Sequence, residues 1–469
     1  MPNLIVRMTV AELSERIAAR ELSPTEVTDA YLAEIASGNP RIHAYVTVAD
    51  ESARREARSL TEEIARRGPR GPLHGIPVAV KDLQDTAGLR TTYGSSFFRD
   101  HVPAADAESV ARLRAAGAVV LGKTNTHEFA CGVSTDNPHH GTTRNPWHPE
   151  RVPGGSSGGS AAAVSAGLAP LATGSDTGGS IRMPAAVCGC VGIKPTHGRV
   201  SLRGTYPMAA SFDHVGPIGR SARDCALALN ALAGFDAEDP WSRRFADEDF
   251  TRLLGAPLAG RRIGVDRSFV PMPLEPAVEA GLERALATLG DLGAEIVEVR
   301  LPPAVDVLTC GFTLISAETH AVHAERFAAS PEGYGADLRG LLASGRSIEG
   351  AAVARAFHRR EDLAREFERL FASVDALISP TVAIEAPPIG GTHVRIGGVE
   401  TDVTLAMASW TMVHNLSRLP TIAIPSGRGA AGLPTSVQIS TAPGEEALAL
   451  GLGDALENAL WPPADRWPA

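Results

Sequence analysis

The chain has 469 residues, of which 44% are apolar and 21% are charged, a balance typical of a globular protein with enough apolar residues for a core. Its net charge of −10 argues against a nucleic-acid partner, and we find no basic run with interleaved aromatic residues. No segment is long and apolar enough to cross a membrane, and residues 1–7 lack the apolar core of a secretory leader.

The number and spacing of the cysteines indicate the redox state of the compartment in which the protein works. There are five of them, an odd number at wide spacing, and nothing in the pattern requires disulfides. We therefore expect a reducing, cytoplasmic environment. Cys188 and Cys190 are one residue apart, which is not the spacing of zinc or redox motifs, so we expect both thiols to pack in the core. We expect no metal and no other cofactor.

Helices are predicted first along the chain. Thr9 with Glu12, and Ser23 with Glu26, have the spacing of capping boxes, and Pro24 suits the first position of the second helix. Further on, we predict helices at residues 50–66, 107–116 and 161–167, and short buried strands at residues 75–80 and 118–121.

The same alternation restarts near residue 260. We predict strands at residues 262–265, 295–298, 376–379 and 421–425, and helices at residues 274–292, 347–371 and 444–460. Helices that alternate with short apolar strands indicate an α/β fold whose sheet is largely buried between helix layers. Because no repeat or low-complexity linker interrupts the pattern, we expect one domain over residues 1–469.

Two glycine-rich loops contain serines. Residues 154–160 read GGSSGGS, and residues 174–182 read GSDTGGSIR. Repeated glycine is expected where backbone N–H groups must approach a ligand closely. Upstream, Lys81 ends the predicted strand at residues 75–80. By itself this lysine would more simply pair with Asp82 or reach solvent, but a buried, neutral lysine is also a base for a serine nucleophile, and the two loops favour that interpretation.

Two other motifs match in spacing alone. Residues 117–124 fit a P-loop, yet a predicted helix precedes them and their four apolar residues predict a strand. Ser156 and Ser157 each fit a nucleophile elbow, yet polar, proline-rich residues precede them where an elbow needs a strand. No downstream histidine has a distinctive setting, so we favour solvated or core histidines over a Ser–His–Asp triad.

Asp176 and Arg182 flank the second loop. We expect them to pair with each other and to hold the loop rigid. Direct contact of either side chain with a substrate is the less favoured alternative.

Taken together, Lys81 and the loops around Ser156 and Ser180 resemble the amidase signature family of serine hydrolases. The resemblance covers most of residues 1–235, including residues 122–130, 145–146 and 192–196. It fades between residues 260 and 400 and returns weakly at residues 415–425 and 432–434.

This family resemblance implies a fold and a division of the chain. The implied fold is α/β, with a central mixed β-sheet covered by α-helices on both sides. Within the single domain, we expect an N-terminal helical region at about 1–66, the signature core at about 67–235, a variable substrate-pocket region at about 236–420 and a closing segment at about 421–469.

The family pattern also implies three catalytic roles. It makes Ser180 the nucleophile, Ser156 the bridging serine and Lys81 the base, with a cis peptide bond between Gly155 and Ser156. Lys81 takes a proton from Ser156, which takes one from Ser180 and later returns one to the leaving nitrogen. Of the two adjacent serines we expect only Ser156, and not Ser157, to face Lys81.

Two further sets of residues follow from the resemblance. The oxyanion hole is expected at the N–H groups of Thr177, Gly178, Gly179 and Ser180. A stretch that lines the site in the family corresponds to Cys131, Gly132, Val133 and Ser134.

The identity of the substrate rests on weaker signals. Met407, Trp410, Met412 and Leu416 form either an apolar wall of the site, with Trp410 as a substrate contact, or part of the core. The family's glutamine-using subunit holds glutamine with an acid, and the matching position here falls near Ala408, which is apolar.

We therefore favour a stand-alone hydrolase of hydrophobic or aryl amides, with anilides and carbamates (urethanes) as plausible substrates and an ester side activity. Such an enzyme is expected to be a monomer or homodimer that binds a small molecule and neither nucleic acid nor membrane. One alternative is a glutamine-hydrolysing amidotransferase A-type subunit. Another is a non-catalytic binding protein on the same fold, against which the intact Lys81, Ser156 and Ser180 argue.

Overall fold

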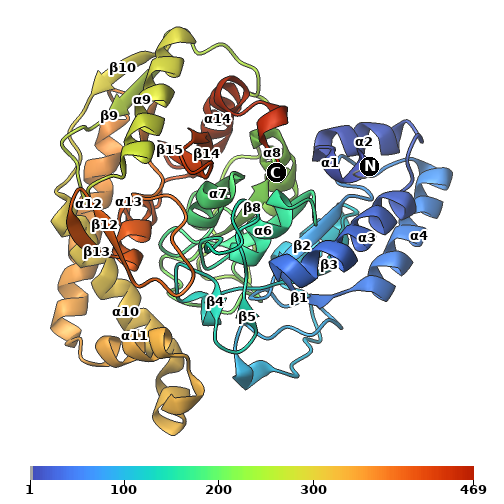
Figure 1. Cartoon of the computed structure of the whole chain (residues 1–469), viewed down its shortest axis with the longest axis horizontal. Helices are drawn as coiled ribbons and strands as arrows, with labels where there is room; N and C mark the ends of the chain where they lie inside the picture. The colour runs from blue at the N-terminus through green and yellow to red at the C-terminus, as the bar shows by residue number, and fades with distance from the viewer. Residues whose placement is uncertain (1–3, 469) are drawn as a thin grey trace.

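A long mixed β-sheet runs through the computed structural model in Figure 1, which describes residues 4–468. Residues 1–3, part of the N-terminal segment considered above, and residue 469 lie outside the described residues. The strands are β1 (Tyr45–Val48), β2 (Pro77–Lys81), β3 (Val119–Thr124), β4 (Asp136–Asn137), β5 (Gly141–Thr142), β6 (Leu171–Ser175), β7 (Val191–Lys194), β8 (Val215–Gly219), β9 (Arg262–Val265), β10 (Glu295–Glu298), β11 (Ala376–Pro380), β12 (His393–Ile396), β13 (Val399–Asp402), β14 (Thr421–Arg428) and β15 (Pro434–Thr441).

The main sheet has eleven strands in the order β1-β3-β2-β6-β8-β7-β14-β15-β11-β9-β10. Neighbours are parallel from β3 through β2 to β6 and from β11 through β9 to β10, and antiparallel elsewhere. The predicted mixed sheet is therefore confirmed. Two small hairpins, β4–β5 and β12–β13, stand apart from it.

Helices cover both faces of this sheet, as Figure 1 shows. They are α1 (Leu4–Arg7), α2 (Val10–Ala18), α3 (Pro24–Ile42), α4 (Asp50–Arg67), α5 (Glu108–Ala115), α6 (Gly158–Ser165), α7 (Arg182–Cys188), α8 (Ala222–Leu232), α9 (Pro276–Asp291), α10 (Ala304–Ala329), α11 (Ala336–Arg346), α12 (Gly350–Leu370), α13 (Val403–Leu416) and α14 (Glu446–Leu460). Short 3₁₀ helices lie at η1 (Ser96–Phe98), η2 (Glu128–Ala130), η3 (Pro331–Gly333) and η4 (Pro463–Asp465).

Strand β14 shows how the two faces are filled. Its Ile422 and Ile424 side chains point at Gly453 of α14, where an added Cβ would lie within 3.0 Å of both. The residue between them pairs with Gly192 of β7, which faces the opposite layer and the side chains of Ile181 and Ala185 at α7. Glycines at these contacts let helix and strand approach closely on either side of the sheet.

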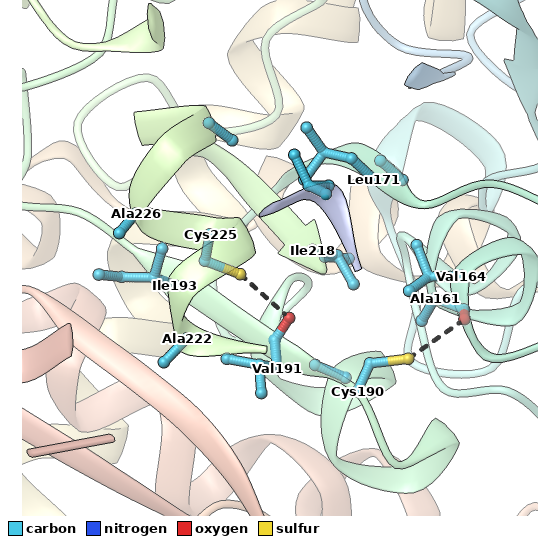
Figure 2. Close-up of a cluster of buried hydrophobic side chains, with 14 of the residues drawn as sticks. Ala161, Val164, Leu171, Cys190, Val191, Ile193, Ile218, Ala222, Cys225 and Ala226 are labelled. Atoms are coloured by element: carbon cyan, nitrogen blue, oxygen red, sulfur yellow. Dashed lines mark hydrogen bonds between the residues drawn. The ribbon is translucent and has the colours of Figure 1, made fainter. Parts of the chain in front are cut away.

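The thiols pack in this core, as expected for Cys188 and Cys190. Figure 2 shows a buried cluster between α6, β7, β8 and α8, in which Cys190 Sγ donates to the carbonyl of Ala161 (3.6 Å) and Cys225 Sγ to that of Val191 (3.5 Å). All five cysteines are free and buried. Burial raises the pKa of the Cys190 thiol to about 12, so it acts as a small apolar side chain with a weak donor.

Both predicted capping boxes form, at Thr9 with Glu12 and at Ser23 with Glu26.

The P-loop interpretation fails as expected, because residues 119–124 form β3 and the buried Lys123 ammonium contacts Thr86 and Thr91. Across residues 4–468, no helix combines the length and the apolar character that a bilayer span requires.

Candidate active site

The glycine loops and Lys81 meet at one edge of the sheet. Lys81 is the last residue of β2, and Ser175 is the last residue of β6. These strands are parallel neighbours, so their carboxyl ends lie side by side. The first glycine loop leads into α6, and the second connects β6 to α7, which brings Ser156 and Ser180 to the same edge.

Lys81 is completely buried among hydroxyl groups. Its Nζ lies 2.8 Å from Ser156 Oγ, 2.9 Å from Ser157 Oγ and 2.8 Å from Ser175 Oγ. Burial lowers the pKa of Lys81 to about 7, and the more distant charges of Asp176 and Asp213 offset this only in part. A neutral amine has one lone pair, so one of the three hydroxyls donates its proton to Nζ while the other two accept.

The expectation that Lys81 faces only one of the adjacent serines is wrong, because its Nζ reaches the hydroxyls of both. The two serines nevertheless differ in their other contacts. Ser157 Oγ donates to the carbonyl of Ser175 (3.2 Å) and accepts from the Ser175 N–H (3.3 Å). In the part of the chain that the structure describes, Ser156 Oγ bonds only to Lys81. Ser156 is thus the serine with a proton free to move, and its peptide bond to Gly155 is cis, as the resemblance implies.

The second loop presents unoccupied backbone donors beside Ser180. Among residues 4–468, the N–H groups of Thr177, Gly178 and Ser180 have no hydrogen-bond partner, whereas the Gly179 N–H donates to Asp176 Oδ1 (2.8 Å). The expected oxyanion hole is therefore corrected at Gly179, whose N–H is engaged within the loop itself. Its backbone has a φ of +130° and a Cβ there would lie 2.2 Å from Thr411 Oγ1, so only glycine fits.

The expected ion pair of Asp176 and Arg182 forms and is fully buried, with a distance of 3.0 Å. Burial alone would raise the pKa of Asp176, but the Arg182 guanidinium holds it at about 2. Arg182 also donates to Gln438 Oε1 (2.8 Å) and Asn415 Oδ1 (2.6 Å). The pair thereby fixes the loop to β15 and α13, and it lies behind the nucleophile rather than in the cavity.

A cavity of about 560 Å³ opens directly onto Ser180. Apolar side chains make up most of its wall, among them Met183, Met208, Phe312 and Leu341. Its lining residues are His127, Ala130, Cys131, Gly132, Val133, Ser134, Thr177, Gly178, Ser180, Met183, Met208, Phe312, Ile315, Ser316, Ala336, Asp337, Gly340, Leu341, Ser344, Gly391, Thr392, Asp402, Val403, Thr404, Ala408 and Met412.

The predicted contacts at residues 131–134 lie on this wall, but Trp410 does not. Its indole packs edge-on against Phe269, with ring centroids 5.9 Å apart, in a second core cluster that also contains Met407 and Leu416. Of the four apolar residues weighed for the wall, only Met412 lines the cavity, together with Ala408. All four residues belong to this core cluster, and Met412 faces the cavity as well.

Several lining residues were not expected from the sequence. Phe312 and Ile315 come from α10, and Asp337 and Leu341 from α11, two helices that we did not predict. His127 could have been predicted as a lining residue from the sequence, because it lies inside the stretch 122–130 that carries the family resemblance. Within residues 4–468, no histidine ring hydrogen-bonds to the hydroxyl of Ser156, Ser157 or Ser180, and His127 reaches Ser156 only through its backbone N–H, which agrees with the argument against a Ser–His–Asp triad.

The different contacts of Ser156 and Ser157 lead to a test of the proton relay. We expect Ser156→Ala to raise the barrier for an anilide by at least ~3 kcal/mol, and that for a nitrophenyl ester by much less, because only the amide needs its leaving group protonated. Ser157→Ala is the matched control: it also removes a contact to Lys81, so it should slow both substrates alike. Steady-state kcat/KM values for the two substrates measure this. Equal losses in Ser156→Ala would assign the relay to another group.

Comparisons with known proteins agree with this geometry. The model of the family described as Amidase matches residues 26–450. The A-type subunit of the glutamyl-tRNA(Gln) amidotransferase of Roseiflexus castenholzii is 39% identical over 480 residues, covering 97% of this chain and 96% of that relative.

Two solved structures are also similar. One, described as "An unexpected vestigial protein complex reveals the evolutionary origins of an s-triazine catabolic enzyme", has a TM-score of 0.93 and 37% identity, covering 96% of this chain and 98% of that chain. A bacterial aryl acylamidase has a TM-score of 0.89 and 28% identity, covering 97% of each chain.

Proposed function

Because this chain belongs to the amidase signature family, we propose that it hydrolyses the C–N bond of a largely apolar carboxamide through an acyl-Ser180 intermediate. The observation that supports this substrate class is the wall of the cavity at Ser180. It is mostly apolar, and no lysine or arginine is among its lining residues within residues 4–468. Aryl amides, anilides and carbamates fit such a wall, since most of their surface is apolar.

The proposed reaction uses the contacts described above. Neutral Lys81 takes the proton of Ser156, Ser156 takes that of Ser180, and Ser180 Oγ attacks the carbonyl carbon. The free N–H groups of the second loop stabilise the oxyanion. Collapse breaks the C–N bond as the proton returns through Ser156 to the leaving nitrogen. Water then attacks the acyl ester by the same relay, releasing the acid and Ser180. An ester side activity follows, because acyl transfer to Ser180 does not require a nitrogen leaving group.

A second candidate is the glutamine-hydrolysing subunit of an amidotransferase. The curated relatives support it more strongly than they support an aryl amidase, since they carry that name at up to 39% identity. The cavity argues in the other direction. The α-carboxylate of glutamine would find no cationic side chain on the wall, apart from a protonated His127, and Ala408 is there in place of the acid expected of that subunit. This candidate would also require partner subunits.

One comparison separates the two candidates. We expect the purified chain alone to release aniline from simple anilides, and to release no ammonia from glutamine above the rate of its Ser180→Ala variant. Aniline is measured spectrophotometrically and ammonia by a coupled assay. Glutamine hydrolysis, or activity that appears only with co-purified partners, would favour the second candidate. Absence of labelling by a serine-directed phosphonate would favour a binding protein without catalysis.

The expected setting follows from the same proposal. We place the reaction in the cytoplasm, where the five free thiols would stay reduced. A monomer or homodimer is sufficient for it, because every group of the proposed relay comes from one chain.

A further inference from the structure

Two carboxylates lie on the wall of the active-site cavity, and both come from elements outside the glycine loops. Asp337 is in the first turn of α11, and Asp402 caps the N-terminus of α13. His127 is the one basic side chain among the lining residues that the structure describes. The wall is therefore negative whether His127 is neutral or protonated.

Both carboxylates keep an oxygen that a ligand can reach. The Asp337 side chain is 77% exposed, and its contact with His127, with Oδ2 3.6 Å from Nε2, lowers its pKa, so it is ionised at neutral pH. Asp402 Oδ1 accepts the N–H groups of Thr404 (2.7 Å) and Leu405 (3.2 Å). Its second oxygen has no hydrogen-bond partner in the part of the chain that the structure describes.

We propose that Asp337 and Asp402 make this enzyme select amides whose acyl or amine part carries an ammonium or similar cationic group, and reject amides with a carboxylate in the same place. The inference rests on the proposed amide hydrolysis and narrows its substrate class. The apolar part of such a substrate packs against apolar lining side chains such as Phe312 and Leu341.

Selection by charge depends on the difference in transition-state stabilisation between a cationic and an anionic substrate. A single exposed ion pair contributes little, because water and salt screen it. Exchanging an ammonium for a carboxylate, however, replaces attraction to both aspartates by repulsion from both. The ratio of kcat/KM for the ammonium substrate to kcat/KM for the carboxylate substrate therefore contains both the attraction and the repulsion. The net charge of −10 acts in the same direction at longer range. We expect a ratio of about tenfold or more at low ionic strength, decreasing as salt is added.

The experiment uses three anilides whose acyl groups have the same length. The 5-aminopentanoyl, hexanoyl and 5-carboxypentanoyl anilides place an ammonium, a methyl or a carboxylate after four methylenes. A second series carries aminomethyl, ethyl or carboxymethyl groups on the aniline ring, for the case that the leaving group faces the aspartates. We expect kcat/KM for the ammonium member to exceed that for the carboxylate member at least about tenfold in one series.

Isosteric variants assign the effect to these side chains. Asp337→Asn and Asp402→Asn should each reduce the ammonium-to-carboxylate ratio, and the double variant should bring it close to one. Asparagine caps helices as well as aspartate does, so Asp402→Asn should keep α13 intact. The matched control is Asp291→Asn, at the exposed end of α9 and away from the cavity, which changes the net charge equally and should leave the ratio as it is.

A binding measurement separates this inference from the proposed function. Calorimetry with the Ser180→Ala variant compares the affinities of the ammonium and carboxylate members without turnover. If the native protein does not hydrolyse the hexanoyl anilide, the proposed function fails, yet tighter binding of the ammonium member would still support selection by charge. Equal binding and equal turnover of the two charged members, or a ratio that the double variant does not change, would overturn it.

Discussion

Replacing Ser180 with alanine is expected to lower kcat for an anilide by about 10⁴-fold or more, because it removes the atom that forms the acyl bond. The fold should be preserved. Within residues 4–468 the Ser180 hydroxyl makes no hydrogen bond, and its main-chain carbonyl, which accepts from the Ser157 N–H, is unchanged by the substitution. The melting temperature should therefore stay close to that of the native protein.

Covalent labelling gives a direct measurement of this role. A serine-directed phosphonate should add one adduct mass to the native protein and none to Ser180→Ala. Ser134→Ala is the matched control, since Ser134 lines the same cavity but its hydroxyl contacts His127 rather than Lys81, and this variant should still be labelled. An adduct that persists in Ser180→Ala would mean that another hydroxyl is the nucleophile.

Local pattern predicted part of the main sheet, namely β2, β3, β9, β10, β11 and β14, but it missed β1, β6, β7, β8 and β15. Residues 262–265 and 295–298 were expected as strands and form β9 and β10 with the same bounds. Each has β-branched apolar residues at its centre or end and lies between turn residues, a pattern from which a short strand can be predicted. The convergence of Lys81 with the loops was expected from the family resemblance, and the structure explains it, since the residues that end the parallel neighbours β2 and β6 share one sheet edge.

The helix α13, which was not predicted, has a different physical character. Nearly every residue of α13 is buried, so its apolar side chains do not form one stripe with a helical period. The same geometry explains Trp410. Ala408 and Met412 are four residues apart and share the face of α13 that lines the cavity, whereas Trp410 lies midway between them and points to the opposite side. Only knowledge of which face meets the cavity could have separated these residues.

Two details of the site depend on contacts that spacing does not reveal. Ser175 was taken as part of a glycine loop, but it ends β6 and reaches Lys81 from the neighbouring strand. The N–H of Gly179 was expected to face the substrate, but the side chain of Asp176 folds back onto it. Such short-range competition for a donor is decided by side-chain conformation, which the residue pattern leaves open.

Lys81→Met should be the second most damaging change. It replaces the proposed base by an apolar side chain of similar length and should lower kcat/KM for an anilide by about 10³-fold or more. In the native protein, kcat/KM should rise with pH through about 7, the value to which burial lowers the Lys81 pKa, because only the neutral amine accepts a proton. The residual activity of the variant should lack this rise. A full-rate variant, or an unchanged pH profile, would remove Lys81 from the mechanism.

Stability provides an independent check on the same pKa. The folded pKa of Lys81 is about 7 and its ordinary value is 10.5, so the unfolded chain binds the additional proton between these pH values. The free-energy cost of burying the charged amine is therefore greatest below pH 7. Between pH 7 and 10.5 this cost decreases, and the free energy of unfolding of the native protein rises, by about 1.4 kcal/mol per pH unit. The melting temperature of Lys81→Met relative to the native protein should thus be highest near pH 6 and should fall steadily as pH rises.

The matched control for both measurements is Lys123→Met. Lys123 is also fully buried, and burial lowers its pKa to about 8, but its Nζ contacts Thr86 and Thr91 and no serine of the site. This variant should show a similar pH trend in relative melting temperature, since it too removes a buried amine. Its anilide hydrolysis should keep the native rise through pH 7, because the amine that titrates there is still in place beside Ser156. A loss of that rise in Lys123→Met would mean that the pH profile reports buried lysines in general rather than the base of the reaction.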